Sequence, residues 1–211
     1  MDTVLKEQYS KLGPKAVDAL NKNGFQAQYV DNKEEAVAAA LKLIEAGATI
    51  GMGGSMTVKA LGLKEVLEKA GHVIYDHQGK PGEEGVKLRH QELGSDVFLT
   101  SSNAVTMEGE LINVDGTGNR LAAMIYGPKR IVMLVGANKI VRDEAAGRER
   151  IRMVAAPLNT LRLKRPTPCT VTGMCMNCKG TTRICNATLV LHRPLSEADF
   201  HVIIIGEALG Y

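Results

Sequence analysis

Aromatic residues are scarce in this chain, and tryptophan is absent. Three Phe and five Tyr are spread over 211 residues, so aliphatic side chains and methionine must fill the core. Proteins that bind single-stranded nucleic acid stack the bases on aromatic side chains, and no aromatic residues are interleaved with the basic ones here. The sequence therefore does not favour nucleic acid as a partner.

Long apolar runs are also missing. No stretch approaches the roughly 20 apolar residues that span a bilayer. The stretch from Met1 to Leu20 is charged and amphipathic, and it lacks the apolar segment of a signal peptide. We therefore expect a cytoplasmic protein with no membrane span. Stable disulfides are disfavoured in that compartment, so cysteines there need another explanation.

The net charge of +3 is unevenly distributed. The segment from Lys139 to Arg193 holds eleven Lys or Arg and three Asp or Glu, which gives it +8 and leaves −5 for the remainder. One interpretation is a solvated basic face. The other is compensation for a buried anionic centre, or an anionic partner such as a small substrate.

Helix and strand patterns alternate along the chain. Apolar residues between Leu5 and Leu20 have helical spacing, with a break or restart expected at Gly13-Pro14. Asp31 and Glu34 have the spacing of a capping box, so a helix should begin there. Further helices are predicted at 63–70, up to Gly94, 120–126 and 143–155.

Short apolar stretches lie between these helices. They predict strands at 26–30, 49–53, 72–76, 97–100, 131–135 and 202–205. The turn at Glu108-Gly109 predicts a hairpin within 104–114. The alternation predicts an α/β fold: a mostly parallel open sheet covered by helices on both faces. We expect residues 1–211 to form a single domain in which 161–188 is a Cys-rich C-terminal loop.

All four cysteines fall within that loop, at Cys169, Cys175, Cys178 and Cys185. Such a cluster in a cytoplasmic chain indicates metal or redox chemistry. Four thiolates suit an iron–sulfur cluster or tetrahedral Zn²⁺. A zinc ribbon usually has two C-x2-C knuckles and this chain has one, which favours [4Fe–4S]. Zinc and a plain thiol pair stay as alternatives, because the spacing equals neither ferredoxin pattern.

A glycine-rich turn follows the predicted strand at 49–53. Gly53, Gly54, Ser55 and Thr57 stand between that strand and a helix, where backbone N–H groups favour a phosphate or carboxylate. The turn is neither a dinucleotide fingerprint nor a P-loop. The alternative is a purely structural β–α turn.

Polar loops follow two other predicted strands, and ligands tend to bind beyond the carboxyl ends of parallel strands. Glu108 is the nearest carboxylate and a candidate catalytic residue, although the alternative, a solvated glutamate in the hairpin turn, is somewhat favoured. The other candidates for binding a small anion are Asn103, Asp115, Gly116, Gly118, Asn119, Arg120 and Lys139.

Several of these blocks resemble the LUD (lactate-utilisation) domain family. They are Asn103-Ala104-Val105-Thr106, the Gly109–Gly116 region, Gly118-Asn119-Arg120, Gly127-Pro128-Lys129 and Gly136-Ala137-Asn138-Lys139. Gly53-Gly54-Ser55 and the segment from Pro168-Cys169 to Cys185-Asn186 resemble short, cysteine-bearing members. The resemblance implies a fold like that of the ribose-5-phosphate isomerase and CoA-transferase superfamily, and a connection to L-lactate oxidation alongside iron–sulfur partner proteins.

Three functions are compatible with these features. The first is an iron–sulfur protein in electron transfer or in oxidation of lactate or a related small organic acid. The second is an isomerase or transferase of phosphorylated or CoA-linked substrates, with Glu108 catalytic and a structural zinc site. The third is a non-catalytic regulatory or assembly subunit. A homo-oligomer is compatible with all three, and the sequence does not fix the oligomeric state.

Overall fold

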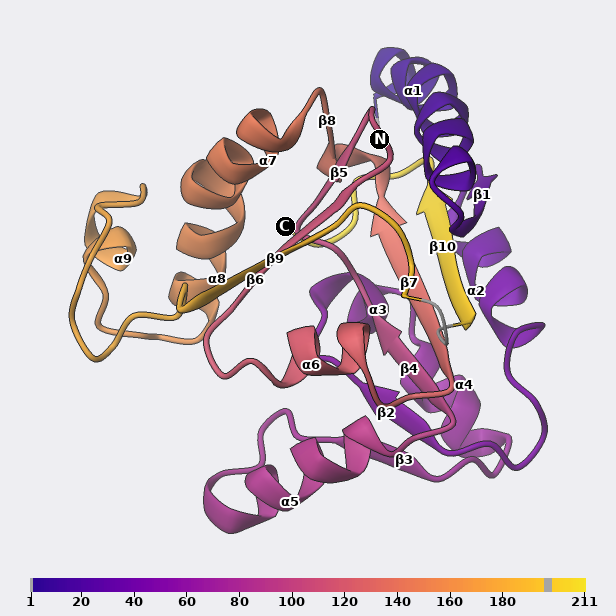
Figure 1. The fold of residues 1–211 in the computed structure, drawn as a ribbon, viewed down its shortest axis with the longest axis horizontal. Coiled ribbons are helices and arrows are strands. Elements are labelled where there is room, and N and C mark those ends of the chain that lie inside the picture. Colours follow the sequence, from indigo (N-terminus) through magenta and orange to yellow (C-terminus); the bar gives the residue numbers. More distant parts are fainter. Residues whose placement is uncertain (1, 196–198) are drawn as a thin grey trace.

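The computed structural model describes residues 2–195 and 199–211. Its centre is a six-stranded sheet with the order β1-β10-β7-β4-β2-β3, in which every neighbouring pair is parallel (Figure 1). The strands are β1 (Gln26–Val30), β10 (Asp199–Ile205), β7 (Arg130–Gly136), β4 (Val97–Thr100), β2 (Ile50–Met52) and β3 (Ile74–Asp76). The predicted parallel sheet is confirmed.

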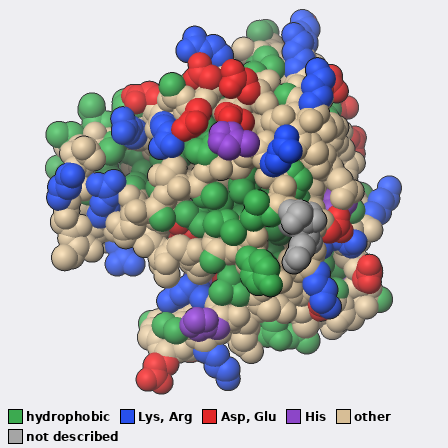
Figure 2. Space-filling model, in the orientation of Figure 1, with side chains coloured by type: hydrophobic (Ala, Val, Ile, Leu, Met, Phe, Trp, Pro, Cys, Tyr) green, Lys and Arg blue, Asp and Glu red, His purple; other side chains and the backbone are tan. Residues whose placement is uncertain are grey.

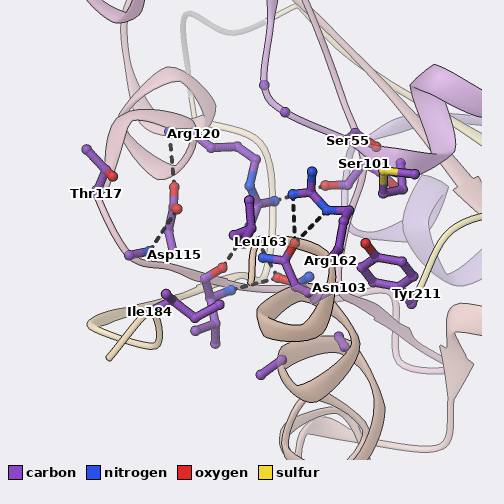
Figure 3. A pocket seen from close by; sticks show the side chains of 18 of the residues that line it. Ser55, Ser101, Asn103, Asp115, Thr117, Arg120, Arg162, Leu163, Ile184 and Tyr211 are labelled. Carbon is purple, nitrogen blue, oxygen red and sulfur yellow. Dashed lines mark hydrogen bonds between the residues drawn. The ribbon is translucent and has the colours of Figure 1, made fainter. Parts of the chain in front are cut away.

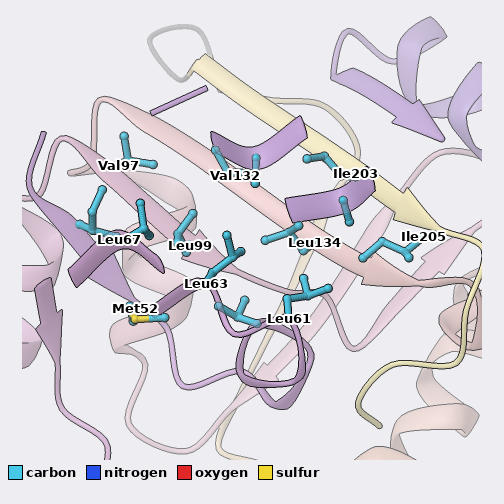
Figure 4. Close-up of a cluster of buried hydrophobic side chains, with 14 of the residues drawn as sticks. Met52, Leu61, Leu63, Leu67, Val97, Leu99, Val132, Leu134, Ile203 and Ile205 are labelled. Atoms are coloured by element: carbon cyan, nitrogen blue, oxygen red, sulfur yellow. The ribbon is translucent and has the colours of Figure 1, made fainter. Parts of the chain in front are cut away.

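Alternate residues of the central strands face two different cores. Val132, Leu134 and Ile203 lie on one face, under helices α2, α3 and α4 (Figure 4). Ile131 and Met133 lie on the other face, under α1, α6 and a second sheet. The continuous apolar run in β7 is therefore explained by burial on both faces. The helices are α1 (Thr3–Lys22), α2 (Lys33–Leu41), α3 (Met56–Ala60), α4 (Leu63–Lys69), α5 (Gly82–Leu93) and α6 (Asn119–Ile125).

The second sheet has four strands in the order β8-β5-β6-β9. The predicted hairpin is confirmed, because β5 (Ala104–Thr106) and β6 (Leu111–Asp115) are antiparallel partners. β8 (Ile140–Val141) pairs with β5 in parallel, and β9 (Ala187–Leu191) pairs with β6 antiparallel. β9 was not predicted, because it is an edge strand whose first two residues are exposed and show no apolar alternation.

Helical segments cover the outer face of the second sheet. α7 (Glu144–Arg150), a π-helical turn (Ile151–Ala155) and α8 (Ala156–Arg162) follow one another without a gap and pack on β5 and β6 through a small third core. α9 (Pro168–Thr172) projects beyond them, at the left of Figure 1. The Cys-rich segment 161–188 thus begins in α8, passes through α9 and ends in β9.

Two local expectations were wrong. α1 runs unbroken through Pro14. The helix is held there by close packing on β1, since a Cβ at Gly13 would lie 2.3 Å from the Tyr29 ring. The capping residue of α2 is Asn32, whose side chain accepts from the Glu35 N–H, while the Glu35 carboxylate takes the Asp31 N–H. The cap is therefore shifted by one residue from the predicted Asp31–Glu34 pair.

Among the described residues, no helix combines the length and the apolar character that crossing a membrane requires.

The packing of β7 gives a direct test of the fold. Leu134→Ala should lower the free energy of unfolding by about 2–5 kcal/mol, because the side chain is fully buried between the sheet and the helices. The exposed Val4→Ala change on α1 is the control and should stay within about 0.5 kcal/mol. Urea denaturation measures both, and equal effects would contradict the assigned core.

Candidate functional site

The carboxyl ends of the parallel strands meet at one edge of the central sheet. The turn after β2, His77 after β3, Ser101 after β4 and Lys139 after β7 all line one cavity of about 360 Å³. Figure 3 labels Ser55 of that turn, and Ser101, among the lining residues. The second sheet and α8 form the opposite wall. This is the edge at which ligands of parallel α/β sheets usually bind.

Most of the predicted binding residues line this cavity. They are Gly53, Gly54, Ser55, Asn103, Asp115, Gly116, Asn119, Arg120 and Lys139. Gly53 lets the turn pack closely on β4, since a Cβ there would lie 2.7 Å from the buried Phe98 ring. α3 has only five residues, so the dipole at its N-terminus contributes little to binding an anion. Anion binding at this site therefore depends on side chains.

Three predicted residues do not line the cavity. Thr57 is buried beneath it, where its hydroxyl donates to the carbonyl of Leu209. Gly118 precedes α6 in a left-handed conformation. Glu108 is exposed at the tip of the β5–β6 hairpin, beside Asn23 at the end of α1. The position of Glu108 therefore gives no support to a catalytic role in this cavity.

Arg120 is the centre of a hydrogen-bond network in the cavity wall. Its guanidinium donates to the carbonyls of Ser101 (3.0 Å) and Val114 (2.9 Å) and to the side chains of Asn113 (2.7 Å) and Asn103 (3.2 Å). These four acceptors are neutral. Burial lowers the pKa of Arg120, and the negative charge of Asp115 acts in the opposite direction. The guanidinium nevertheless stays protonated, as arginine does in proteins. The network therefore holds a positive charge in a fixed place.

Lys139 is a second cation at this site and, unlike the partly exposed Arg120, it is buried. Its side chain is 3 % exposed, and its Nζ donates to the hydroxyls of Thr57 (2.8 Å) and Ser101 (3.0 Å). Burial, and then the positive charges of Arg150 and Arg120, lower the pKa of Lys139 to about 7. Among the described residues, no carboxylate lies within ion-pair distance of this amine.

Positive charge dominates the lining. The cationic side chains are Arg89, Arg120, Lys139, Arg162 and Arg165, whereas Asp115 is the one carboxylate side chain that the described residues contribute. In the space-filling view an indentation separates the surface over α9 from that over α5, with basic side chains on both sides (Figure 2). The site therefore suits a small anion.

A histidine and a buried glutamate form a pair at the edge of the cavity. His77 Nδ1 lies 2.6 Å from Oε1 of Glu92, a carboxylate on α5 that is 1 % exposed. The same oxygen accepts the His77 backbone N–H (3.0 Å), which fixes the ring. The ring lies near the glycine turn, since a Cβ at Gly54 would be 3.7 Å from His77 Nε2. A histidine oriented by a carboxylate is suited to accept or donate a proton.

The four cysteines line a second, smaller cavity of about 30 Å³ between α8 and the loop after α9. Two hydroxyls lie within hydrogen-bond distance of Cys169 Sγ, that of Thr160 at 3.3 Å and that of Thr167 at 3.2 Å. The Asn177 N–H donates to Cys175 Sγ (3.4 Å). Burial raises the pKa of Cys185, and the three neighbouring cysteines add to the effect. The sequence cluster is thus also a spatial cluster.

Arg183 braces the loop around this second cavity. Its guanidinium donates to the carbonyls of Cys178 (2.5 Å) and Cys185 (2.7 Å). A single zinc ion, with Zn–S bonds of about 2.3 Å, would draw four sulfur atoms to within about 3.8 Å of one another. Within residues 2–195 and 199–211, no group of three or more His, Cys, Asp or Glu side chains is arranged to hold a metal ion. The thiols surround a common space without closing on one point.

Cys185 joins the two cavities. Together with Ala156 and Ile184, it lines both the large cationic cavity and the small cysteine cavity. A group held by the four thiols would therefore lie against a ligand in the large cavity, separated from it by the thickness of one residue.

The family model described as the LUD domain matches residues 14–205, which is most of the chain. The chain belongs to the LUD domain family. Membership supports a role related to lactate utilisation. The match includes the lining of both cavities except Tyr211, so the cationic site and the four cysteines belong to this LUD domain.

Among solved structures, the LUD domain is similar to a duf162 family protein from Deinococcus radiodurans, determined by crystallography at 1.70 Å resolution. The TM-score is 0.55 at 17 % sequence identity, over 93 % of this chain and 98 % of that chain. At this identity the likeness shows a shared fold alone. No curated protein matches the chain.

The sequence interpretation missed several residues of the LUD domain site. His77 directly follows the strand predicted at 72–76, so the rule that drew attention to Asn103 and Lys139 would also have found it. Glu92 gave no signal, because a glutamate inside a helix is ordinarily solvated. Arg162 and Arg165 come from the end of α8, and only the fold brings them to the strand ends.

The lowered pKa of Lys139 predicts a pH-dependent stability. Between about pH 7 and the ordinary lysine pKa, the unfolded chain binds a proton here that the folded chain lacks, so the free energy of unfolding rises with pH. Lys139→Met should reduce that slope by up to about 1.4 kcal/mol per pH unit. Urea denaturation between about pH 7.5 and 9.5 measures it, with exposed Lys69→Met as the control. An unchanged slope would contradict the lowered pKa.

Proposed function

We propose that this LUD domain holds an iron–sulfur cluster on Cys169, Cys175, Cys178 and Cys185. We further propose that it binds a small organic anion in the adjoining cationic cavity, in the oxidation of lactate or a related 2-hydroxy acid. The main support for the proposal is that Cys185 lines both the cysteine cavity and the cationic cavity.

The cysteine surroundings favour a cluster over a single zinc ion. Hydroxyl and backbone groups already approach the sulfur atoms, and such hydrogen bonds tune the potential of a cluster. All four thiols line one common space. That space, at about 30 Å³, must widen to hold a cluster. The exposed loop between Gly173 and Thr182 is the part that would move outward.

The charge of the large cavity favours a carboxylate ligand. Arg120 contributes a fixed positive charge, because its guanidinium N–H groups are already engaged with neutral acceptors. Arg162 is exposed and bonded to Asn159 on its own helix, so it is free to turn and donate to an incoming carboxylate. The volume of about 360 Å³ is within the range of small-molecule sites.

The paired His77 and Glu92 supply a proton acceptor for the hydroxyl group of such a ligand. Glu92 holds the imidazole through Nδ1, which leaves Nε2 for the substrate. An iron–sulfur cluster, when bound, supplies one-electron transfer, and sustained turnover then requires a protein that accepts the electrons. Free thiols of this kind suit a reducing, cytoplasmic location.

Anaerobic purification followed by iron and sulfide analysis tests the cluster. The expected result is a brown protein with about four iron and four sulfide per chain and a broad visible absorbance. Cys175→Ser should lose most of the iron, because one of the four thiolates is removed. Met176→Leu, an exposed neighbour in the same loop, should keep it.

Two results of the metal analysis would contradict the iron–sulfur cluster. A colourless protein with one zinc per chain would contradict the proposal. Iron content that Cys175→Ser leaves unchanged would show that the iron is bound elsewhere.

A further inference from the structure

The amine of Lys139 is placed as a nucleophile and not as a structural cation. It lies at the end of β7, buried, and it lines the large cavity. Its hydrogen-bond partners are two hydroxyls, Thr57 at 2.8 Å and Ser101 at 3.0 Å. A buried lysine that served only to stabilise the fold would be expected to pair with a carboxylate. None of the described residues offers one within ion-pair distance.

The charged groups that face Lys139 are both positive. Arg120 approaches from α6 and Arg150 from α7, where Arg150 donates to the carbonyls of Asn138 (3.2 Å) and Asn103 (2.7 Å). Burial and two neighbouring cations favour the neutral form of an amine. At about pH 7 roughly half of Lys139 is neutral, whereas an ordinary lysine with a pKa of about 10.4 is neutral in roughly one molecule in 2,500.

We propose that Lys139 forms an imine with the carbonyl carbon of a small 2-oxo acid bound in the cationic cavity. The choice of ligand rests on the proposed function, because oxidation of a 2-hydroxy acid gives a 2-oxo acid. The ligand has two recognisable groups: a carboxylate for the arginine-lined wall and a carbonyl carbon for the amine.

The chemistry balances without an oxidant or a reductant. The lone pair of Lys139 Nζ attacks the carbonyl carbon, a C–N bond forms and the carbonyl oxygen takes up a proton. That first proton comes from the attacking nitrogen, and the second N–H proton passes to the hydroxyl group as the C–O bond breaks and water leaves. Thr57 and Ser101, both in contact with Nζ, are placed to relay these protons. Hydrolysis by the same route reverses the reaction.

Reductive trapping tests this assignment directly. The whole protein is incubated with pyruvate and sodium cyanoborohydride at about pH 7, and peptide mass spectrometry locates the reduced adduct. Lys139 should carry an adduct that saturates with pyruvate, at a level about tenfold or more above exposed lysines such as Lys129, because its neutral fraction is far larger. Lactate, which has no carbonyl group, should give none.

Lys139→Met should lose the saturable adduct, whereas Lys129→Met should keep it. Labelling of surface lysines with Lys139 unmodified in the wild-type protein would overturn the proposal, whether or not the variant folds. Iron is measured on the same samples. An adduct on Lys139 in protein that lacks iron would support the imine and contradict the iron–sulfur cluster. Iron in protein that forms no adduct would support the cluster and contradict the imine.

Discussion

Two cations, the buried Lys139 and the partly buried Arg120, lie at the carboxyl edge of the central sheet, and no carboxylate of the described residues is ion-paired with either. Burying a charge without an opposite charge is costly unless hydrogen bonds replace the lost water. Four neutral acceptors serve Arg120, and two hydroxyls serve Lys139. Most of these acceptors come from the loop after β4 and from β6 itself. An anionic ligand would supply the missing opposite charge.

The cysteine centre is connected to this cavity by topology. β9 pairs antiparallel with β6, and Asn186, just before β9, bonds to the backbone at Asp115 and Gly116. Cys185 is therefore held at the wall of the cavity by the same strand that carries Asp115. α8 forms the other side of both cavities. A ligand in the large cavity and a group bound by the thiolates would be neighbours, because the pairing of β9 with β6 positions Cys185, which lines both cavities.

Local patterns in the sequence predicted the parts of the fold that depend on burial and turn chemistry. The run at Ile131–Val135 indicated a doubly covered strand, and the polar loops indicated Asn103, Arg120 and Lys139 as candidates for binding a small anion. Other features depend on long-range contacts. Pro14 stays inside α1 because Gly13 packs on Tyr29, and the partner that makes His77 notable is Glu92, fifteen residues away on α5. Glu108 looked equivalent to the other polar loop residues, but the hairpin directs it away from the cavity.

The decisive experiment is diffraction, recorded at the iron absorption edge, from crystals of anaerobically purified protein grown with L-lactate. We expect an anomalous iron signal enclosed by the four cysteine sulfur atoms. We also expect lactate density beyond Cys185, with its carboxylate towards Arg120. Iron absent from the cysteines, or lactate bound outside the cationic cavity, would contradict the proposed function.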